Sequence, residues 1–283
     1  EVLALRPAPI QAHFLGYGFT TGADYIDWLI TDKIKTPEEE RPWVEENLAW
    51  LPNQCLPASR PIISTETFTR EQFGLPQDAF VFADFNSHFK IDPEVFSAWM
   101  RILRKAPDSI LWLIDFQGPG NEALKREASA RGVDPSRIIF ADKYPNDVHL
   151  ARLALADLAL DTYHHAGGVT TTDALWAGLP VLTIMHEGMV DRLGGSVLTA
   201  AGLPELIASS LDDYMRKALA YFEDPDSLQR LKVKLKDNQA TEPLFDTPRL
   251  TRDLEAIFTE MWNRYEDGAE PGTIELAPVP ADG

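Results

Sequence analysis

Residues 158–183 read LALDTYHHAGGVTTTDALWAGLPVLT, and this stretch decides the fold. It opens with an apolar run typical of a buried strand and breaks at the glycine pair Gly167 and Gly168. From Val169 onward the pattern predicts a helix, which the later Gly-Leu-Pro ends before a second apolar run. A strand, a glycine-rich turn and a helix start in this order present free backbone N–H groups to a phosphate.

Outward from this stretch, apolar strands and amphipathic helices alternate along the chain. Apolar runs at 80–83, 110–114 and 138–140 predict further buried strands, and the segments between them predict helices. Strands that alternate with helices form a parallel, doubly wound sheet with right-handed crossovers. The sequence therefore predicts an α/β protein.

Composition along the chain indicates how it divides. Residues 52–62 are rich in proline and polar residues, which is typical of a linker, and the chain's end is acidic and rich in proline and glycine. We therefore predict a boundary near residue 70 and three parts: residues 1–70, residues 71–265 and a flexible acidic tail over residues 266–283.

Charge and cysteine content exclude several classes of protein. Acidic residues outnumber basic ones 44 to 26, for a net charge of -18, so the chain repels the phosphates of nucleic acids and we expect no nucleic-acid partner. The one cysteine, Cys55, cannot form an internal disulfide. No apolar run approaches the ~20 residues of a transmembrane helix, and no signal peptide is visible. We expect a cytoplasmic protein that does not bind membranes.

The loops that follow the predicted strands meet at the carboxyl edge of the sheet, where such folds bind ligands. Lys90 follows the first of these strands and has the charge to neutralise a diphosphate, although a solvent-exposed lysine is an equal alternative. Thr170 and Asp173 have the spacing of a capping box. The alternative is that the helix N–H groups bind a diphosphate while Asp173 accepts a hydrogen bond from a sugar hydroxyl.

Histidines offer further candidates. His149 and Arg152 lie three residues apart on one face of a predicted helix, which suits contact with a base or a phosphate, or an ordinary exposed face. His164 and His165 are adjacent and lack the spacing of metal ligands, and the sequence holds no Asp-x-Asp pair or His/Cys cluster, so we expect no metal. The residues alone thus predict an α/β domain that binds a phosphate-bearing ligand, most simply a nucleotide.

Several motifs together resemble the catalytic region of the O-linked N-acetylglucosamine transferases, glycosyltransferase family 41, which have the two-lobed GT-B fold. They occur in the family's order and spacing over almost the whole chain to about residue 265. The motifs are LRPAPIQ (5–11), LGY (15–17), FN (85–86), KIDP (90–93), LWL (111–113), RIIF (137–140), DT (161–162), GG (167–168), TTTDALWAG (170–178) and PLF (243–245).

This resemblance implies an inverting, metal-independent transfer of a sugar from a UDP-sugar, typically UDP-N-acetylglucosamine, to Ser or Thr hydroxyls of an acceptor protein. No cofactor beyond the donor is implied. Lys90 would contact the diphosphate as the catalytic residue. The other donor contacts would be Ser87, Tyr144, His149, Arg152, Gly168, Val169, Thr170 and Asp173, and the sugar pocket would include Leu15, Gly16, Phe89 and Phe116.

The sequence also departs from the family's pattern. Val169 replaces a threonine of the phosphate turn and Ser87 a glutamine near the phosphates, although a valine keeps its backbone N–H. The family's catalytic region normally begins upstream of this chain and follows tetratricopeptide repeats. By this resemblance, residues 1–70 would be the remainder of an incomplete N-terminal lobe and residues 71–265 the C-terminal nucleotide-sugar-binding lobe. We assign no general base. Two alternatives remain open: the same scaffold with another donor such as GDP-fucose, and a non-catalytic nucleotide-binding module.

Overall fold

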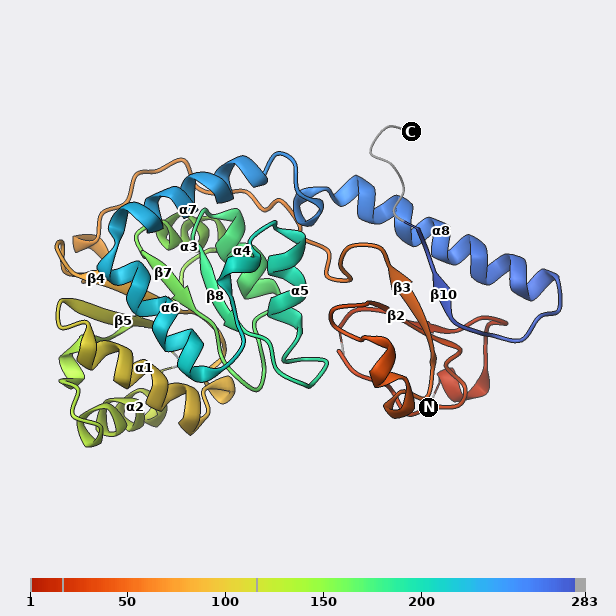
Figure 1. The fold of residues 1–283 in the computed structure, drawn as a ribbon, viewed down its shortest axis with the longest axis horizontal. Helices are drawn as coiled ribbons and strands as arrows, with labels where there is room; N and C mark the ends of the chain where they lie inside the picture. Colours follow the sequence, from red (N-terminus) through yellow and green to blue (C-terminus); the bar gives the residue numbers. More distant parts are fainter. Residues whose placement is uncertain (1, 17, 116, 278–283) are drawn as a thin grey trace. The chain divides into compact units, whose positions relative to one another are not determined.

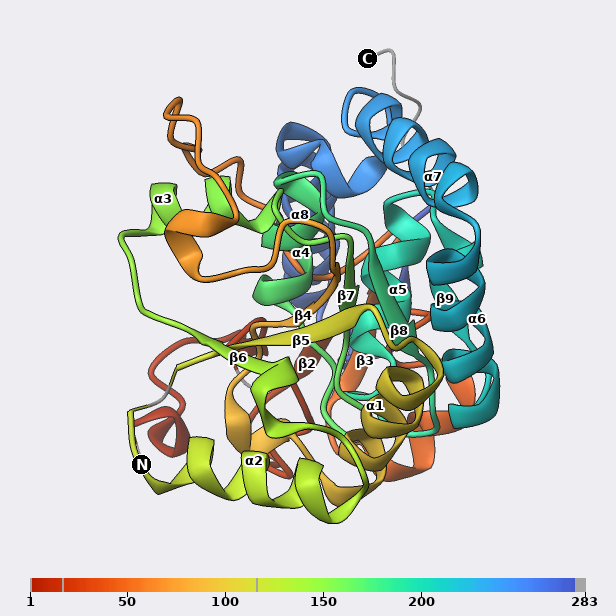
Figure 2. The same cartoon turned by 90° about the vertical axis from the view of Figure 1, so that its left-hand side faces the viewer.

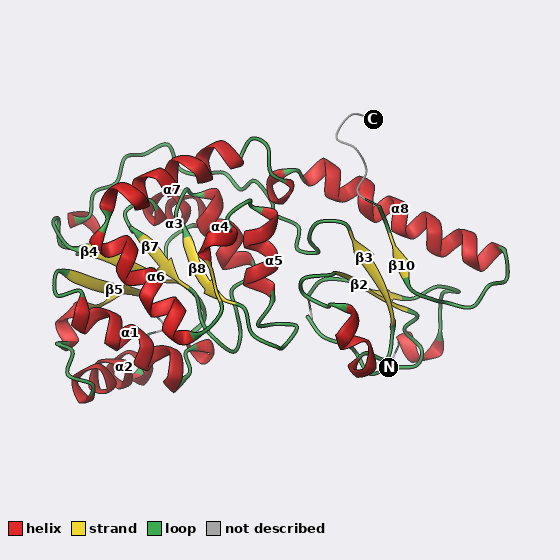
Figure 3. Cartoon of the chain, in the orientation of Figure 1, coloured by secondary structure: helices red, strands yellow, loops and turns green. Residues whose placement is uncertain are grey.

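The computed structural model describes residues 2–16, 18–115 and 117–277 (Figure 1). The chain forms two compact units, one built from Glu1–Ser59 with Thr241–Gly283 and the other from Arg60–Ala240. Each unit contains a parallel sheet with helices packed against it, as Figure 3 shows by colour. The predicted α/β class is confirmed.

A six-stranded parallel sheet forms the centre of the Arg60–Ala240 unit. Its strand order is β6-β5-β4-β7-β8-β9. The chain first adds β5 and β6 on one side of β4, and it then crosses back and adds β7, β8 and β9 on the other side. The order therefore reverses between β4 and β7, and in open α/β sheets ligands bind outside the carboxyl ends of the strands at such a reversal. The strands are β4 (Phe80–Asp84), β5 (Ser109–Ile114), β6 (Ile138–Ala141), β7 (Leu158–Leu160), β8 (Val181–Ile184) and β9 (Ile207–Ala208).

Helices cover both faces of this sheet, with α1 and α2 on one side and α3 and α4 on the other (Figure 2). The first of them begins at Pro93, because Asp92 accepts hydrogen bonds from the N–H groups of Glu94 and Val95 and a proline suits the first helical position. The α-helices of this unit are α1 (Pro93–Lys105), α2 (Pro119–Ala130), α3 (Asn146–Leu153), α4 (Val169–Trp176), α5 (Leu193–Ala200), α6 (Leu211–Glu223) and α7 (Pro225–Asn238).

The other unit holds a four-stranded parallel sheet in the order β1-β2-β3-β10, with the long helix α8 beside it (Figure 1). Its elements are β1 (Ala12–His13), β2 (Trp28–Asp32), β3 (Asn47–Leu51), α8 (Thr247–Glu266) and β10 (Ile274–Glu275). Short 3-10 helices complete the chain at Leu3–Leu5, Glu38–Trp43, Glu71–Phe73, His88–Lys90, Pro135–Arg137, Pro204–Leu206 and Pro243–Phe245. No helix within the described residues is both long and apolar enough to span a bilayer.

The last part of the chain differs from the prediction. Instead of completing the nucleotide-binding lobe, α8 packs on the first unit, where Ile257 and Met261 join a core with Trp28. Residues 266–277 do not form a loose tail, because β10 pairs with β3 and Ile274 is only 2% exposed. The indole N–H of Trp28 also donates to the carbonyl oxygen of Gly272 at 2.9 Å. Residues 278–283, the rest of the predicted tail, lie outside the described residues.

Substitution of Ile274 tests this docking of the chain's end. Ile274→Ala removes buried methyl groups from the first unit and should lower the free energy of unfolding by about 2–4 kcal/mol. Urea unfolding followed by tryptophan fluorescence measures the change. Glu275→Ala is the matched control, since it removes only an exposed ion pair with Lys33 and should cost less than about 1 kcal/mol. Equal stabilities for both variants would contradict the docking.

Candidate functional site

Two loops meet at the reversal of the strand order. One follows β4 and contains Lys90, and the other follows β7 and leads into α4. The two strands are hydrogen-bonded neighbours, with Phe82 opposite Leu158 and Ala83 opposite Ala159, so their carboxyl ends lie side by side. The fold thus places the predicted diphosphate-binding lysine next to the predicted phosphate turn.

Asn86 joins the two loops directly. Its side-chain oxygen Oδ1 accepts a hydrogen bond from Thr170 Oγ1 at 2.7 Å and a longer one from Lys90 Nζ at 3.5 Å. Lys90 Nζ also donates to the carbonyl oxygen of Ala166 at 3.3 Å, in the turn that precedes α4. Lys90 is half-buried, and this burial lowers its pKa, while the nearby carboxylates of Asp161 and Asp84 act in the opposite direction.

The two buried carboxylates, Asp84 and Asp161, lie beneath this junction at the ends of β4 and β7. Asn86 Nδ2 donates to Oδ1 of both, at 2.9 and 3.0 Å. Asp161 is well satisfied, because it also accepts from the backbone N–H groups of Thr162 and Gly167 and, at 2.7 Å, from the hydroxyl of Thr183.

Asp84 is less well satisfied than its neighbour. Its Oδ2 is buried and has no hydrogen-bond partner among the described residues. Burial is the main cause that raises the pKa of Asp84 to about 7, and the negative charge of Asp161 raises it further. Burial also raises the pKa of Asp161, while its hydrogen bonds and the charge of Lys90 act in the opposite direction. The site is thus a half-buried cation above two carboxyl groups that burial makes weaker acids.

The start of α4 tests the capping-box interpretation of Thr170 and Asp173. The residue before the helix is Gly168, and no side chain caps the helix there. The hydroxyl of Thr170 donates to Asn86 instead, so the capping-box alternative is wrong. The backbone N–H groups of the first helical turn therefore lack intrahelical acceptors, as at any helix start, and they remain available to an anion.

Two residues of this turn show why the sequence suits it. Gly167 packs so closely that a Cβ would lie 2.5 Å from Thr171 Oγ1 and 2.7 Å from Thr170 Oγ1, so a larger residue would push the turn apart. The side chain of Val169 is 62% exposed and takes no part in the junction. The valine that stands in place of the threonine expected from the family thus takes no contact away from the junction.

A small cavity of about 40 Å³ opens beside this turn. It has room for a few water-sized groups, so it can hold one part of a nucleotide rather than the whole ligand. Asp173 is half-buried in its wall, burial raises the pKa of its carboxyl group, and its side chain has no hydrogen bond to any described residue. The polar lining residues are Asp84, Asn86, His149, Asp161, Thr170, Thr171 and Asp173.

His149 and Arg152 have different positions from one another despite their shared helix face. His149 lines the cavity, whereas Arg152 is fully buried behind it. The guanidinium carbon of Arg152 lies 5.0–5.6 Å from the ring centres of four aromatic residues: Phe73, Phe85, Trp112 and Tyr144. Such packing stabilises a buried cation through cation–π attraction, and Nη1 of Arg152 is buried without a hydrogen-bond partner among the described residues.

Arg152 acts on His149. Its Nε and Nη2 lie 3.3 and 3.0 Å from His149 Nδ1. Because a guanidinium only donates, Nδ1 of His149 is the acceptor and the ring proton is on Nε2. Burial, together with the charge of Arg152, lowers the pKa of His149 to about 4, so the ring is neutral at pH 7. In this structure Arg152 orients a histidine rather than offering its own charge to a ligand.

The remaining predicted residues are less closely gathered. Ser87 lies half-buried in the β4 loop, Phe89 is 73% exposed and Tyr144 borders the aromatic group around Arg152. Leu15 and Gly16 belong to the other unit and both have positive φ angles, of 58° and 87°. Their role in a sugar pocket stays a prediction. Phe116, predicted for the same pocket, lies outside the described residues.

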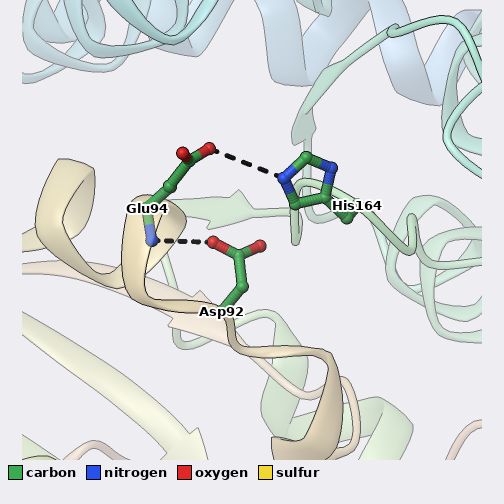
Figure 4. Close-up of side chains that lie close together, drawn as sticks. All are labelled: Asp92, Glu94 and His164. Carbon is green, nitrogen blue, oxygen red and sulfur yellow. Dashed lines mark hydrogen bonds and ion pairs between the residues drawn. The ribbon is translucent and has the colours of Figure 1, made fainter.

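A third group of side chains, Asp92, Glu94 and His164, lies close together near the start of α1 (Figure 4). Their nearest ligand-type atoms all lie within 4.8 Å of one another, and His164 Nε2 is 3.5 Å from Glu94 Oε2. Asp92 also caps α1, and the other two side chains are exposed. Such exposed groups are common without an ion, so the expectation that no metal binds stays a prediction.

Sequence reasoning missed the residues that support the site. Asp84 and Asp161 each directly follow a buried apolar strand, and this position was a signal that both lie at the ligand-binding edge. The aromatic group around Arg152 had no comparable signal, because its members come from separate segments of the chain.

Comparisons with known proteins identify the family of this chain. The model of glycosyl transferase family 41 matches residues 1–58 and 57–254. The chain is 38% identical over 278 residues to a probable UDP-N-acetylglucosamine--peptide N-acetylglucosaminyltransferase, SEC, of Arabidopsis thaliana, covering 96% of this chain and 28% of that protein. It is 28% identical over 380 residues to the UDP-N-acetylglucosamine--peptide N-acetylglucosaminyltransferase of Caenorhabditis elegans, covering 95% of this chain and 33% of that protein.

Solved structures give the same result. A mutant O-GlcNAc transferase of Thermobaculum terrenum superimposes with a TM-score of 0.85 at 30% identity, covering 94% of this chain and 51% of that one. Sucrose-phosphate synthase of Thermosynechococcus elongatus matches with a TM-score of 0.56 at 16% identity, covering 86% of this chain and 58% of that one, a likeness of fold alone. The expected GT-B type fold is confirmed. The chain belongs to glycosyl transferase family 41.

Proposed function

We propose that this chain forms the donor-binding part of an enzyme that transfers N-acetylglucosamine from UDP-N-acetylglucosamine to Ser or Thr hydroxyls of proteins. The observation that carries the proposal is the junction at the strand-order reversal, where Lys90 and the start of α4 converge through Asn86. The relatives, of which this chain spans 28–33% in Arabidopsis and Caenorhabditis, are named for this reaction.

The chemistry of the junction suits a departing diphosphate. In an inverting transfer the acceptor oxygen bonds to the anomeric carbon as the bond from that carbon to the β-phosphate oxygen breaks. Negative charge then grows on the diphosphate. Lys90 and the N–H groups at the start of α4 are preorganised donors for that charge. Lys90 thus stabilises the charge of the leaving group. The acceptor hydroxyl needs a separate base to take its proton, and we assign no residue of this chain to that role.

Two residues that line the cavity beside α4 have the chemistry to contact parts of a nucleoside. Asp173 has a free carboxylate to accept from a ribose hydroxyl, and His149 has an Nε2–H to donate to a carbonyl oxygen of the base. These contacts favour a nucleoside diphosphate without deciding between uracil and guanine. A GDP-fucose donor is therefore the first alternative, and a module that binds nucleotide without turnover is the second.

Calorimetric titration with UDP, with GDP as the comparison, tests the proposal on the chain as it stands. Lys90→Ala should weaken UDP binding about 10- to 100-fold, the range expected for loss of a charge-assisted contact. Lys105→Ala, at the far end of α1, should leave the affinity unchanged. Tighter binding of GDP than of UDP would indicate a GDP-sugar as the donor. Binding of neither nucleotide, or unchanged affinity in Lys90→Ala, would contradict the proposal.

The role of Asp173 can be tested by changing either its carboxylate or the ribose hydroxyls of the ligand. Asp173→Asn should weaken UDP binding about tenfold, because it removes the charge from a hydrogen bond to the ribose. The wild-type chain should lose a similar factor for 2′,3′-dideoxy-UDP, and the variant should hardly distinguish UDP from that analogue. A variant that still prefers UDP by the wild-type factor would place the ribose elsewhere.

The protonation of His149 has a consequence for stability. Its folded pKa, about 4, lies below the ordinary value of 6.5, so the unfolded chain takes up a proton first as the pH falls. The contribution of His149 to the free energy of unfolding should therefore fall as the pH is lowered from 6.5 towards 4. The histidine NMR titration should show the low pKa, and His149→Gln should reduce the loss of stability over this window. A pKa near 6.5 would contradict the burial.

A further inference from the structure

Asn86 is the side chain on which both halves of the junction depend. Its Nδ2 faces Asp84 and Asp161, at 2.9 and 3.0 Å, and its Oδ1 faces Thr170 and Lys90, at 2.7 and 3.5 Å. The side chain is 4% exposed, so these four contacts use its whole hydrogen-bonding capacity without water.

The chemistry of its neighbours fixes which way the amide points. Asp161 Oδ1 already accepts from two backbone N–H groups, so it presents only an acceptor, which the NH₂ group of Asn86 must face. Lys90 is a donor only, so it must face the amide oxygen. A flipped amide would set the oxygen against a carboxylate and the NH₂ group against an ammonium, and both contacts would be repulsive.

This orientation has a consequence for Lys90. An ammonium has three N–H donors, and two of them are directed to Asn86 Oδ1 and the carbonyl oxygen of Ala166. The remaining donor is left for an anion over the start of α4. Thr170 is held by the same amide oxygen from the other side, although it lies 84 residues away in the sequence.

We propose that Asn86 is a positioning residue that holds Lys90 and the first turn of α4 in the arrangement that binds the diphosphate. This inference rests on the proposed function, since it concerns the same donor site. The competing explanation is structural: Asn86 would only separate two buried carboxyl groups, and its loss would weaken the fold and every ligand contact alike.

A double-mutant cycle separates the two explanations. Calorimetry of the full chain with UDP compares the wild type, Asn86→Ala, Lys90→Ala and the double variant. Asn86→Ala should weaken UDP binding about tenfold in the wild-type background but less than about twofold in the Lys90→Ala background, because residues that act through one another are not additive. The affinity for uridine, which lacks the diphosphate, should stay within about twofold throughout.

Two further variants serve as a control and as a substitute for Asn86→Ala. Tyr214→Phe removes a hydroxyl that donates to the Asp161 carbonyl oxygen and accepts from Trp99, so it loosens the same buried region without a contact to Lys90. It should lower the melting temperature and leave the ratio of UDP to uridine affinity unchanged. If Asn86→Ala does not fold, Thr170→Val removes the amide's partner from an exposed position and should weaken UDP binding severalfold, again without affecting uridine.

The outcomes are distinct. Equal losses in both backgrounds, or a parallel loss for uridine, would overturn the positioning role while leaving UDP binding by Lys90 intact. If Thr170→Val is the variant used, an unchanged affinity for UDP would also overturn the positioning role of Asn86. Absence of UDP binding by the wild-type chain would instead reject the proposed function, and the role of Asn86 with it.

Discussion

The structure depends on burying two carboxyl groups side by side beneath the ligand edge. Asp84 and Asp161 end neighbouring strands, and taking both from water without donors would be strongly unfavourable. Asn86 supplies one donor to each, and the half-buried charge of Lys90 lies above them. The negative charge below favours the ammonium form of Lys90, which burial alone would discourage. The cation that would bind a phosphate is thus kept charged by groups that never touch it.

This arrangement also explains why the start of α4 is left open. A helix usually satisfies its first N–H groups with a side chain at the cap, and Thr170 with Asp173 had the spacing to do so. The hydroxyl of Thr170 instead donates to Asn86, and the residue before the helix is a glycine, which has no side chain to cap it. The free N–H groups cost some helix stability. An anion at this position would recover it, which couples ligand binding to local order.

Much of the fold followed from local pattern. The apolar runs predicted β4 to β8. Lys90 and the glycine turn were correctly placed at one edge, because loops after parallel strands share it. Contacts between distant segments could not be predicted in this way. The pairing of Ile274 with Ala49 joins opposite ends of the chain, and the burial of Arg152 depends on aromatic residues that no spacing rule connects.

A net charge of -18 opposes the approach of an anionic ligand, but this repulsion depends on the distance between the charges. Most of the acidic groups are solvent-exposed, and charges beyond about 8 Å are largely screened at physiological ionic strength. The donors at the junction act at hydrogen-bond range from fixed positions, where screening is weak. A polyanion that extends over the surface would meet the acidic groups, whereas a single diphosphate would meet only Lys90 and the start of α4. The acidic surface is therefore compatible with a small anionic ligand at the junction.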